Sequence, residues 1–512
     1  MLARFLTISA VIFGLHFSLK AQSYRPVFHF TPEKNWTNDP NGLVYYKGEY
    51  HIFFQHNPFG DVWGHMSWGH ATSKDMMKWT YKPIALREYP NGNGTTTMFF
   101  SGTAVADKNN TSGFAKKPDE VPLIAIYTAH VDSSSNGISQ SQHLAYSHDG
   151  IHFQRYSKNP LIDLHTTDFR DPKVFWSKGA GQWVMVASKP LDYVLQFYGS
   201  PDLKNWKLLS EFTDSNADKS KIWECPDIFE LSVKNEPGRS KWVVTLSGGH
   251  PQKNDFIAMQ YFIGDFDGIK FTADKFSYPL YVDEGKDFYA GIIINSLPET
   301  DKRKIMIGWA NCWAYANKIP TKGFRGQMSV PRELNLYRNE TGELRMTSFP
   351  VREVDNYMGR LLLNESSVTV NGHKNLDHVK GDALDIEFII DKGSADRAGV
   401  SILKNGSHET LIYYNKADHT LKIDRTKSGN ISFSDKFASV ESIALPENDK
   451  EVSLRILVDK CIIEVFANKG EQVMTDLVFP LSEDVSAELF SEGGATTFRN
   501  IKVHKMLPSM KN

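Results

Sequence analysis

The chain has 512 residues, of which 41% are hydrophobic and 23% are charged, and its formal net charge is −2 at pH 7. This length exceeds what one ordinary hydrophobic core serves, and the composition is that of a globular protein, so we expect two large domains. The charge is close to neutral and no long basic run occurs, which argues against a nucleic-acid partner.

The first 22 residues have the features of a secretory signal peptide. Arg4 precedes an apolar run from Phe5 to Leu19, and the small residue Ala21 follows it. The run is shorter than the roughly 20 residues that a membrane-spanning helix needs. We therefore expect a protein exported to the periplasm or the medium, with no membrane span once residues 1–22 are removed. An uncleaved anchor helix is the alternative.

The three cysteines, Cys225, Cys312 and Cys461, are odd in number and far apart in the chain. Such spacing indicates neither a disulfide framework nor a metal-binding cluster. We therefore expect the fold to depend on its hydrophobic core.

From about residue 24 to 350, short β-type segments alternate with turns rich in Gly, Pro, Asn and Asp. A pair of strands recurs five times, with first strands that begin near Asp39, Ser101, Asp171, Asp227 and Tyr289. The second strands are expected at residues 50–55, 123–128, 183–188, 242–247 and 304–309. Their spacing of roughly 60 to 70 residues is typical of a repeat architecture. Five such repeats predict a five-bladed β-propeller, and one or two large sandwiches are the alternative.

The pattern changes after Pro350, and we interpret residues 354–365 as a linker. Beyond them, apolar and polar residues alternate in short segments at 383–390, 398–404, 410–415, 420–424, 452–458 and 461–467. This alternation predicts an antiparallel sandwich. The expected fold is therefore all-β: a propeller that forms the catalytic domain over residues 23–353, followed by a C-terminal β-sandwich over residues 366–512.

Three of the expected first strands carry an acid just before a proline. These segments read Asn38-Asp39-Pro40, Arg170-Asp171-Pro172 and Glu224-Cys225-Pro226. Proline is tolerated at the first position of a strand, because its missing N–H removes no ladder bond there. A single Asp-Pro pair is commonly an ordinary turn. Three copies at the repeat period indicate that Asp39, Asp171 and Glu224 meet at one mouth of the propeller.

Carboxylates gathered in one concave site suit the hydrolysis of a glycosidic bond. One carboxylate attacks the sugar or activates water, and another protonates the leaving oxygen. Repulsion between close carboxylates raises at least one pKa, which supplies the protonated acid. Aromatic and polar side chains near these acids could form the walls of a sugar site or simply pack the blades: Trp36, Phe53, Trp63, Trp68, Trp223, Trp309, Asn38, Gln55 and Arg170.

Several motifs resemble those of glycoside hydrolase family 32, the invertase, inulinase and levanase family. They are WTNDPNG at 36–42, FQHNP at 54–58, WGHATS at 68–73, FSG at 100–102, FRDP at 169–172, WECPD at 223–227 and DFYA at 287–290. Val458-Asp459 and the IEVF run at 463–466 are similar to the family's sandwich motif. The resemblance covers nearly the whole chain after residue 22, in order.

The resemblance implies a five-bladed propeller joined to a β-sandwich, and a retaining double-displacement reaction. It implies that Asp39 is the nucleophile, that Glu224 is the general acid/base, and that Asp171 binds fructose hydroxyls and stabilises the transition state. It also implies that neither a metal nor an organic cofactor is needed. The implied substrate contacts are Asn38, Gln55, Trp63, Ser101, Arg170 and Trp309.

Three further segments, at 109–114, 264–268 and 313–316, look most like exo-acting levanases and inulinases. We therefore expect an enzyme that releases terminal fructose from fructans, fructo-oligosaccharides and sucrose, with Trp36, Trp63 and Trp223 closing the mouth around one ring. A fructosyltransferase, an endo-fructanase and a non-catalytic fructan-binding protein are the alternatives. The presence of all three acids argues against the last. These sugars are the expected partners, and neither linkage preference nor oligomeric state is specified.

Overall fold

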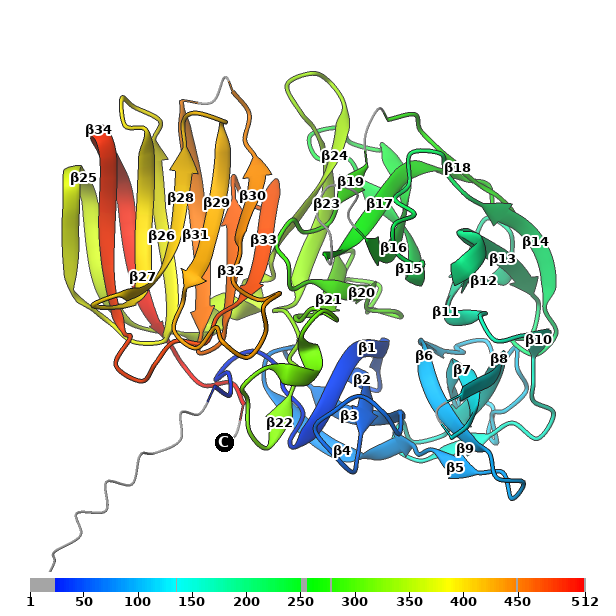
Figure 1. The fold of residues 1–512 in the computed structure, drawn as a ribbon. Coiled ribbons are helices and arrows are strands. Elements are labelled where there is room, and N and C mark those ends of the chain that lie inside the picture. The colour runs from blue at the N-terminus through cyan, green and yellow to red at the C-terminus, as the bar shows by residue number, and fades with distance from the viewer. Residues whose placement is uncertain (1–23, 135, 250–255, 277–278, 448–449, 511–512) are drawn as a thin grey trace, which may run out of the picture.

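The structure is a computed structural model that describes residues 24–510 except 135, 250–255, 277–278 and 448–449. Residues 1–22, the expected signal peptide, lie outside the described residues. The described chain is nearly all β and forms a ring of blades beside a second, layered β body (Figure 1). Among the described residues, no helix has the length and apolar character needed to cross a bilayer.

In the described ranges, five sheets make up the ring, antiparallel except for the parallel pairing of β22 with β1, which confirms the predicted five-bladed propeller. The first blade contains β1 (Asn35–Tyr46), β2 (Glu49–Asn57), β3 (Ser67–Ser73), β4 (Trp79–Leu86) and β22 (Phe324–Arg325). The second contains β5 (Tyr89–Pro90), β6 (Thr96–Ala106), β7 (Leu123–Ser133), β8 (Asn136–Ser147), β9 (Phe153–Arg155) and β10 (Ile162–Thr166). The third contains β11 (Arg170–Ser177), β12 (Gln182–Lys189), β13 (Val194–Ser200) and β14 (Lys207–Phe212).

The fourth blade contains β15 (Glu224–Ser232), β16 (Ser240–Gly249), β17 (Ile257–Phe266), β18 (Phe271–Ala273) and β19 (Leu280–Tyr281). The fifth contains β20 (Tyr289–Ile293), β21 (Lys304–Trp309), β23 (Arg332–Arg338) and β24 (Leu344–Pro350). Short 3-10 turns occur at η1 (Pro190–Asp192), η2 (Ala316–Lys318) and η3 (Arg352–Tyr357). The innermost strands β1, β6, β11, β15 and β20 each contact the next around the ring, and each carries a predicted first-strand start.

Side chains close the propeller axis below the mouth. Lys173 of β11 forms a 2.9 Å ion pair with Asp227 of β15 and donates to the carbonyl of Ile293 in β20. Asn295, just after β20, donates to Thr103 of β6. The ion pair joins two neighbouring blades, whereas the hydrogen bonds of Lys173 and Asn295 join blades that are not neighbours in the ring, so these two hydrogen bonds cross the axis. A cavity at the mouth therefore has a closed floor.

The second body is a β-sandwich that contains β25 (Met358–Lys380), β26 (Ala383–Asp391), β27 (Arg397–Asn405), β28 (His408–Asn415), β29 (Thr420–Lys427), β30 (Val440–Ala444), β31 (Glu451–Asp459), β32 (Ile462–Ala467), β33 (Gln472–Leu477) and β34 (Ser486–Met506). One half of β34 pairs with β27 and the other half with β26. Gly493 and Gly494 lie between the two halves with positive φ, opposite a register shift at Gly372 of β25. The two long strands therefore bend and pass from one layer to the other.

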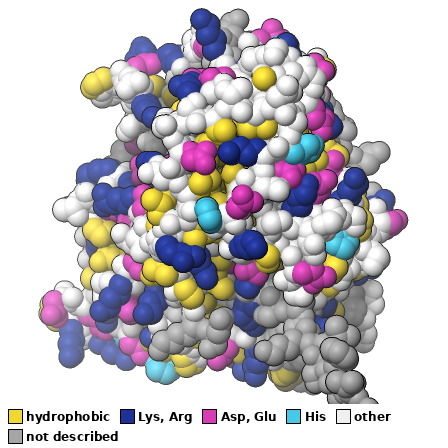
Figure 2. All heavy atoms as spheres, turned by 90° about the vertical axis from the view of Figure 1, so that its left-hand side faces the viewer, with side chains coloured by type: hydrophobic (Ala, Val, Ile, Leu, Met, Phe, Trp, Pro, Cys, Tyr) yellow, Lys and Arg dark blue, Asp and Glu magenta, His cyan; other side chains and the backbone are white. Residues whose placement is uncertain are grey.

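Residues 354–365, expected to be a linker, are instead the end of η3 and the beginning of β25. This part of β25 is mostly exposed or half-buried, so no alternation of apolar residues marks it as a strand in the sequence. The outer face of the sandwich carries Lys and Arg side chains interspersed with Asp and Glu (Figure 2). Such mixing is typical of a solvated surface.

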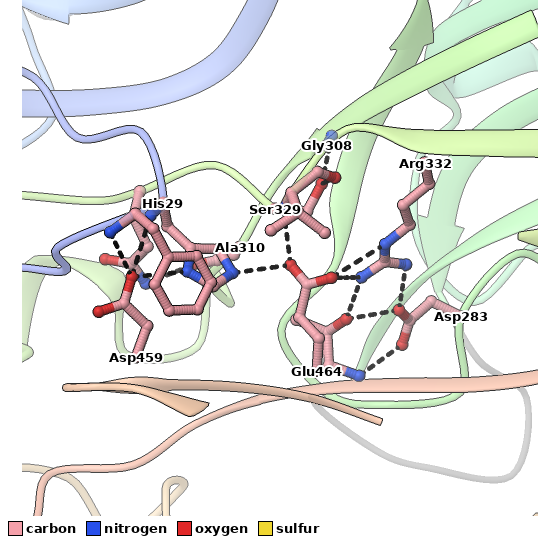
Figure 3. Close-up of polar contacts among 12 residues, drawn as sticks. His29, Asp283, Gly308, Ala310, Ser329, Arg332, Asp459 and Glu464 are labelled. Carbon is pink, nitrogen blue, oxygen red and sulfur yellow. Dashed lines mark hydrogen bonds and ion pairs between the residues drawn. The ribbon is translucent and has the colours of Figure 1, made fainter. Parts of the chain in front are cut away.

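Buried charges join the propeller to the sandwich (Figure 3). Arg332 of β23 contacts Glu464 of β32 at 2.9 Å and Asp283 at 2.8 Å, and all three side chains are fully buried. His29 lies between Glu464 and Asp459. Burial lowers the pKa of His29, but its hydrogen bonds to the two carboxylates prevail and raise that pKa to about 9. Two buried cations thus share three carboxylates at the boundary, two from the sandwich and Asp283 from the propeller, and each charge has a partner.

We predict that Arg332→Ala destabilises the protein strongly, because it leaves the buried carboxylates of Asp283 and Glu464 without their cation. Removing one partner of a buried ion pair costs about 3–5 kcal/mol, which should lower the thermal unfolding midpoint by several degrees. The matched control is Arg338→Ala on the same strand, where an exposed pair with Glu236 contributes little. Equal shifts of the midpoint in the two variants would contradict this role of the interface.

Candidate functional site

A cavity of about 810 Å³ opens at the mouth of the propeller, where the inner strands begin. Every blade contributes to its wall. All of the predicted site residues except Trp309 line it: Asn38, Asp39, Gln55, Trp63, Ser101, Arg170, Asp171 and Glu224. The sequence analysis missed other lining residues, among them Phe100, His130, Gly137, Gln140, Asp168, Trp313 and Asn317.

Each inner strand has a β-bulge at the cavity. The pairing register with the second strand shifts between Thr37 and Pro40, Phe99 and Gly102, Arg170 and Lys173, Glu224 and Asp227, and Tyr289 and Ile292. A bulge bends a strand and turns side chains away from their regular faces. Asp39, Ser101 and Asp171 lie within the bulges, and Glu224 and Tyr289 stand at their edges. The repeat therefore turns one polar side chain per blade towards the axis.

The backbone of three bulges is strained, since Asp171, Cys225 and Ala290 have positive φ. In each case a side chain from the preceding blade accepts a hydrogen bond from the bulged N–H. Asp171 N donates to Thr128 Oγ1 at 2.9 Å, Cys225 N to Asp171 Oδ2 at 3.0 Å, and Ala290 N to Ser247 Oγ at 2.9 Å. Neighbouring blades therefore hold the strained conformations in place.

Asp39 is buried and hydrogen-bonded on both oxygens. Ser101 donates to Oδ2 at 2.7 Å, Asn38 donates to Oδ1 at 3.1 Å, and the Cys225 thiol lies 3.3 Å from Oδ2. Burial raises the pKa of Asp39, the Ser101 hydrogen bond lowers it, and the nearby Glu224 charge raises it again. The hydrogen bonds fix the carboxylate in one orientation and favour its ionised form against the cost of burial.

Asp171 is also buried. Burial raises the pKa of this carboxyl group from 3.8 to about 7, although the Arg170 guanidinium, 3.9 Å away, opposes the change. The charges of Glu224 and Asp39 contribute to this increase in the pKa. Glu224 is the most exposed of the three acids, with 23% of its side chain accessible. Its Oε1 accepts a hydrogen bond from Arg170 Nε at 3.2 Å and its Oε2 accepts one from the Tyr289 hydroxyl at 2.8 Å.

Trp309 does not line the cavity, contrary to the prediction. It is fully buried, and its ring packs against Trp313 at 4.7 Å and Trp36 at 6.1 Å. The side chain belongs to the second strand of its blade and faces the core. Trp313, in the loop that follows, provides the aromatic surface instead. No repeat marks this loop in the sequence.

Trp36 and Trp223 were expected as walls, and this is wrong as well, because both are fully buried. Trp36 does not line the cavity but orients Asn38, which does, by donating its indole N–H to Asn38 Oδ1 at 2.7 Å. Trp63 does stand at the rim, where 41% of it is exposed.

In the part of the chain that the structure describes, no group of three or more His, Cys, Asp or Glu side chains could hold a metal ion.

Comparisons with known proteins agree with this geometry. Residues 29–348 match the glycosyl hydrolases family 32 N-terminal domain, and residues 359–505 match the family 32 C-terminal domain. The chain is 40% identical to a levanase of Bacillus subtilis strain 168, over 95% of this chain and 71% of that protein. It is 38% identical to an extracellular exo-inulinase of Aspergillus niger, over 95% of both chains.

Solved structures are similar too. The exo-inulinase of Aspergillus awamori superposes with a TM-score of 0.88 at 35% identity, covering 96% of this chain and 99% of that one. A fructofuranosidase of Schwanniomyces occidentalis, solved as a complex with fructosylnystose, gives a TM-score of 0.81 at 31% identity and covers 93% of this chain and 97% of its own.

We predict that Asp171→Asn stabilises the protein at pH 8 by several degrees in the thermal midpoint, and that this gain disappears at pH 4. The pKa of Asp171 is about 7 in the fold and lower when unfolded, so the wild type loses stability as pH rises between about 4 and 7. An amide mimics the protonated acid and avoids that loss. The matched control is Asp192→Asn in η1 of the same blade, whose side chain is 55% exposed. A gain that does not depend on pH would contradict the argument.

Proposed function

The chain belongs to glycosyl hydrolase family 32, and on that premise we propose that it is an exo-acting β-fructofuranosidase. It hydrolyses terminal β-fructofuranosyl residues of fructans, fructo-oligosaccharides and sucrose. The observation that carries the proposal is the convergence of Asp39, Asp171 and Glu224 in one cavity with a closed floor. Relatives named levanase and exo-inulinase support the same reaction.

In the proposed reaction Asp39 is the nucleophile. Ser101 and Asn38 hold its carboxylate by hydrogen bonds, so the side chain loses little conformational entropy when it attacks. An Asp39 oxygen bonds to the anomeric carbon of fructose as the glycosidic bond breaks, and Glu224 gives its proton to the leaving oxygen. Water then donates a proton back to Glu224, and its oxygen displaces Asp39 from the anomeric carbon. Two displacements retain the configuration.

The position of each acid suits its role. Glu224 is the most exposed of the three, as suits an acid that protonates a departing leaving group. Arg170 and Tyr289 bind its two oxygens and fix its orientation. Asp171 is deeper and bound to the backbone of Cys225, where it can accept hydrogen bonds from fructose hydroxyls. Asn38, Gln55, Trp63, Ser101 and Arg170 provide the other proposed substrate contacts.

We also propose that the protein is exported. The signal-like residues 1–22 support this, and the relative from Aspergillus niger is named an extracellular enzyme. The mature protein then consists of the propeller as catalytic domain and the sandwich as a packing partner, joined by the buried charges described above.

We expect Asp39→Asn to lower kcat at least about a thousandfold, because no covalent ester can form. Glu224→Gln should lower kcat by about 10² to 10⁴ on natural substrates. The loss of kcat in Glu224→Gln should be much smaller on fructosyl fluoride, because its leaving group needs no proton. The measurements are initial rates of the purified variants, with Asp192→Asn as the control and circular dichroism to verify folding. Near wild-type sucrose hydrolysis by folded Asp39→Asn would refute the assignment.

The closed floor predicts attack at chain ends, because a polymer cannot pass through the cavity. Free fructose should be the main early product from levan or inulin, and the mean chain length should fall slowly. A chromatographic time course measures both. Early accumulation of mid-length oligosaccharides would refute exo-action while leaving the three acids in their roles. Net synthesis of longer oligomers at high sucrose concentration would indicate the transferase alternative.

A further inference from the structure

We propose that the hairpin formed by β7 and β8 binds the sugar ring of the leaving group, with His130 as the contact that selects oligosaccharide substrates. The proposal rests on the proposed fructoside hydrolysis and adds a site on the other side of the scissile bond. It is carried by the position of His130 along its strand, by its fixed tautomer and by the space that Gly137 leaves beside it.

The position of His130 follows from the register of β7. Thr128 lies at the depth of the acids, because its hydroxyl accepts the Asp171 N–H at 2.9 Å. His130 is two residues farther along β7, so it lies on the same face and about 7 Å away. This part of β7 pairs with β6 residues that precede Ser101, towards the mouth. His130 therefore stands about one sugar ring farther out than the acids, where the leaving group must lie.

The hydrogen bonds of Gln140 determine the tautomer of His130. Gln140 Oε1 accepts from Phe169 N at 3.0 Å and from Arg170 Nη1 at 3.2 Å, so this end of the amide must be the oxygen. The amide nitrogen therefore faces His130 Nδ1 at 3.2 Å and donates to it. A neutral ring that accepts at Nδ1 carries its proton on Nε2.

The ring of His130 is held so that this proton is available. It stacks on Phe100 with centroids 4.2 Å apart and an interplanar angle of 6°. Burial lowers the pKa of His130; Asp132 opposes this and Arg170 adds to it, so the ring is neutral at neutral pH. Nε2 makes no hydrogen bond to any of the described residues, and His130 lines the cavity. An N–H donor at a cavity wall suits a sugar hydroxyl oxygen.

Gly137 provides room for this ring. A Cβ atom at position 137 would lie 2.8 Å from His130 Cε1, closer than atoms can approach. Gly137 also lines the cavity, so a side chain there would push the His130 ring off Phe100. The cavity, at about 810 Å³, lies in the upper part of the range for ligand sites and has room for more than the terminal fructose.

The test compares a substrate that has a sugar leaving group with one that has almost none. The trisaccharides 1-kestose and levantriose lose a disaccharide, whereas methyl β-fructofuranoside loses methanol. We expect His130→Ala to lower kcat/KM on the trisaccharides about tenfold, as for one lost hydrogen bond. Methyl β-fructofuranoside should stay within about twofold of wild type. His130→Phe, which keeps an aromatic ring on Phe100 but has no donor, should show the same selective loss.

The matched control is His152→Ala in the same blade, whose side chain is 82% exposed and which does not line the cavity; it should change neither rate. Equal losses on both kinds of substrate would overturn the proposal and show that His130 only supports Gln140 and Arg170. No loss on the trisaccharides would overturn it as well. In both cases the wild-type rates leave the proposed function intact, whereas a wild type that hydrolyses none of these fructosides would refute that function itself.

Discussion

The site depends on one backbone irregularity that is repeated around the ring. Each inner strand begins with a β-bulge, and the bulges direct side chains of successive blades towards one point on the axis. A regular strand would alternate its side chains between the two faces of the blade. The bulge is therefore what converts a sheet that packs against its neighbours into one that also presents a carboxylate to a cavity.

The bulges also couple the blades to one another. The N–H groups of Asp171, Cys225 and Ala290 are bound by side chains of the preceding blade, so the strain of one blade is compensated by its neighbour. Asp171 takes part twice, since its own N–H is held by Thr128 and its carboxylate holds Cys225. A residue that is placed for chemistry thus also maintains the geometry of the next acid along the chain.

Buried charge occurs in two places with different consequences. At the boundary with the sandwich, each buried cation has carboxylate partners, so the network fixes how the two bodies meet. At the mouth, three carboxylates share mainly Arg170 as a cation, and burial raises the pKa of Asp39 and Asp171. Such an unbalanced cluster reduces stability, and proteins accept that cost where function requires it.

The sequence by itself determined the five strand pairs, six of the sandwich strands and the meeting of Asp39, Asp171 and Glu224. These features are local or periodic: alternation, turn residues and an acid before a proline recur at a fixed spacing. Which aromatic rings reach the cavity was decided by the tertiary structure, because spacing fixes the position of Trp309 on its strand but not what packs over it. The tertiary structure likewise decided the roles of His130 and Gln140, because their hairpin brings Gln140 into hydrogen-bonding contact with Arg170 of the next blade. It also paired the charges of Arg332 and Glu464, which lie more than a hundred residues apart in the sequence.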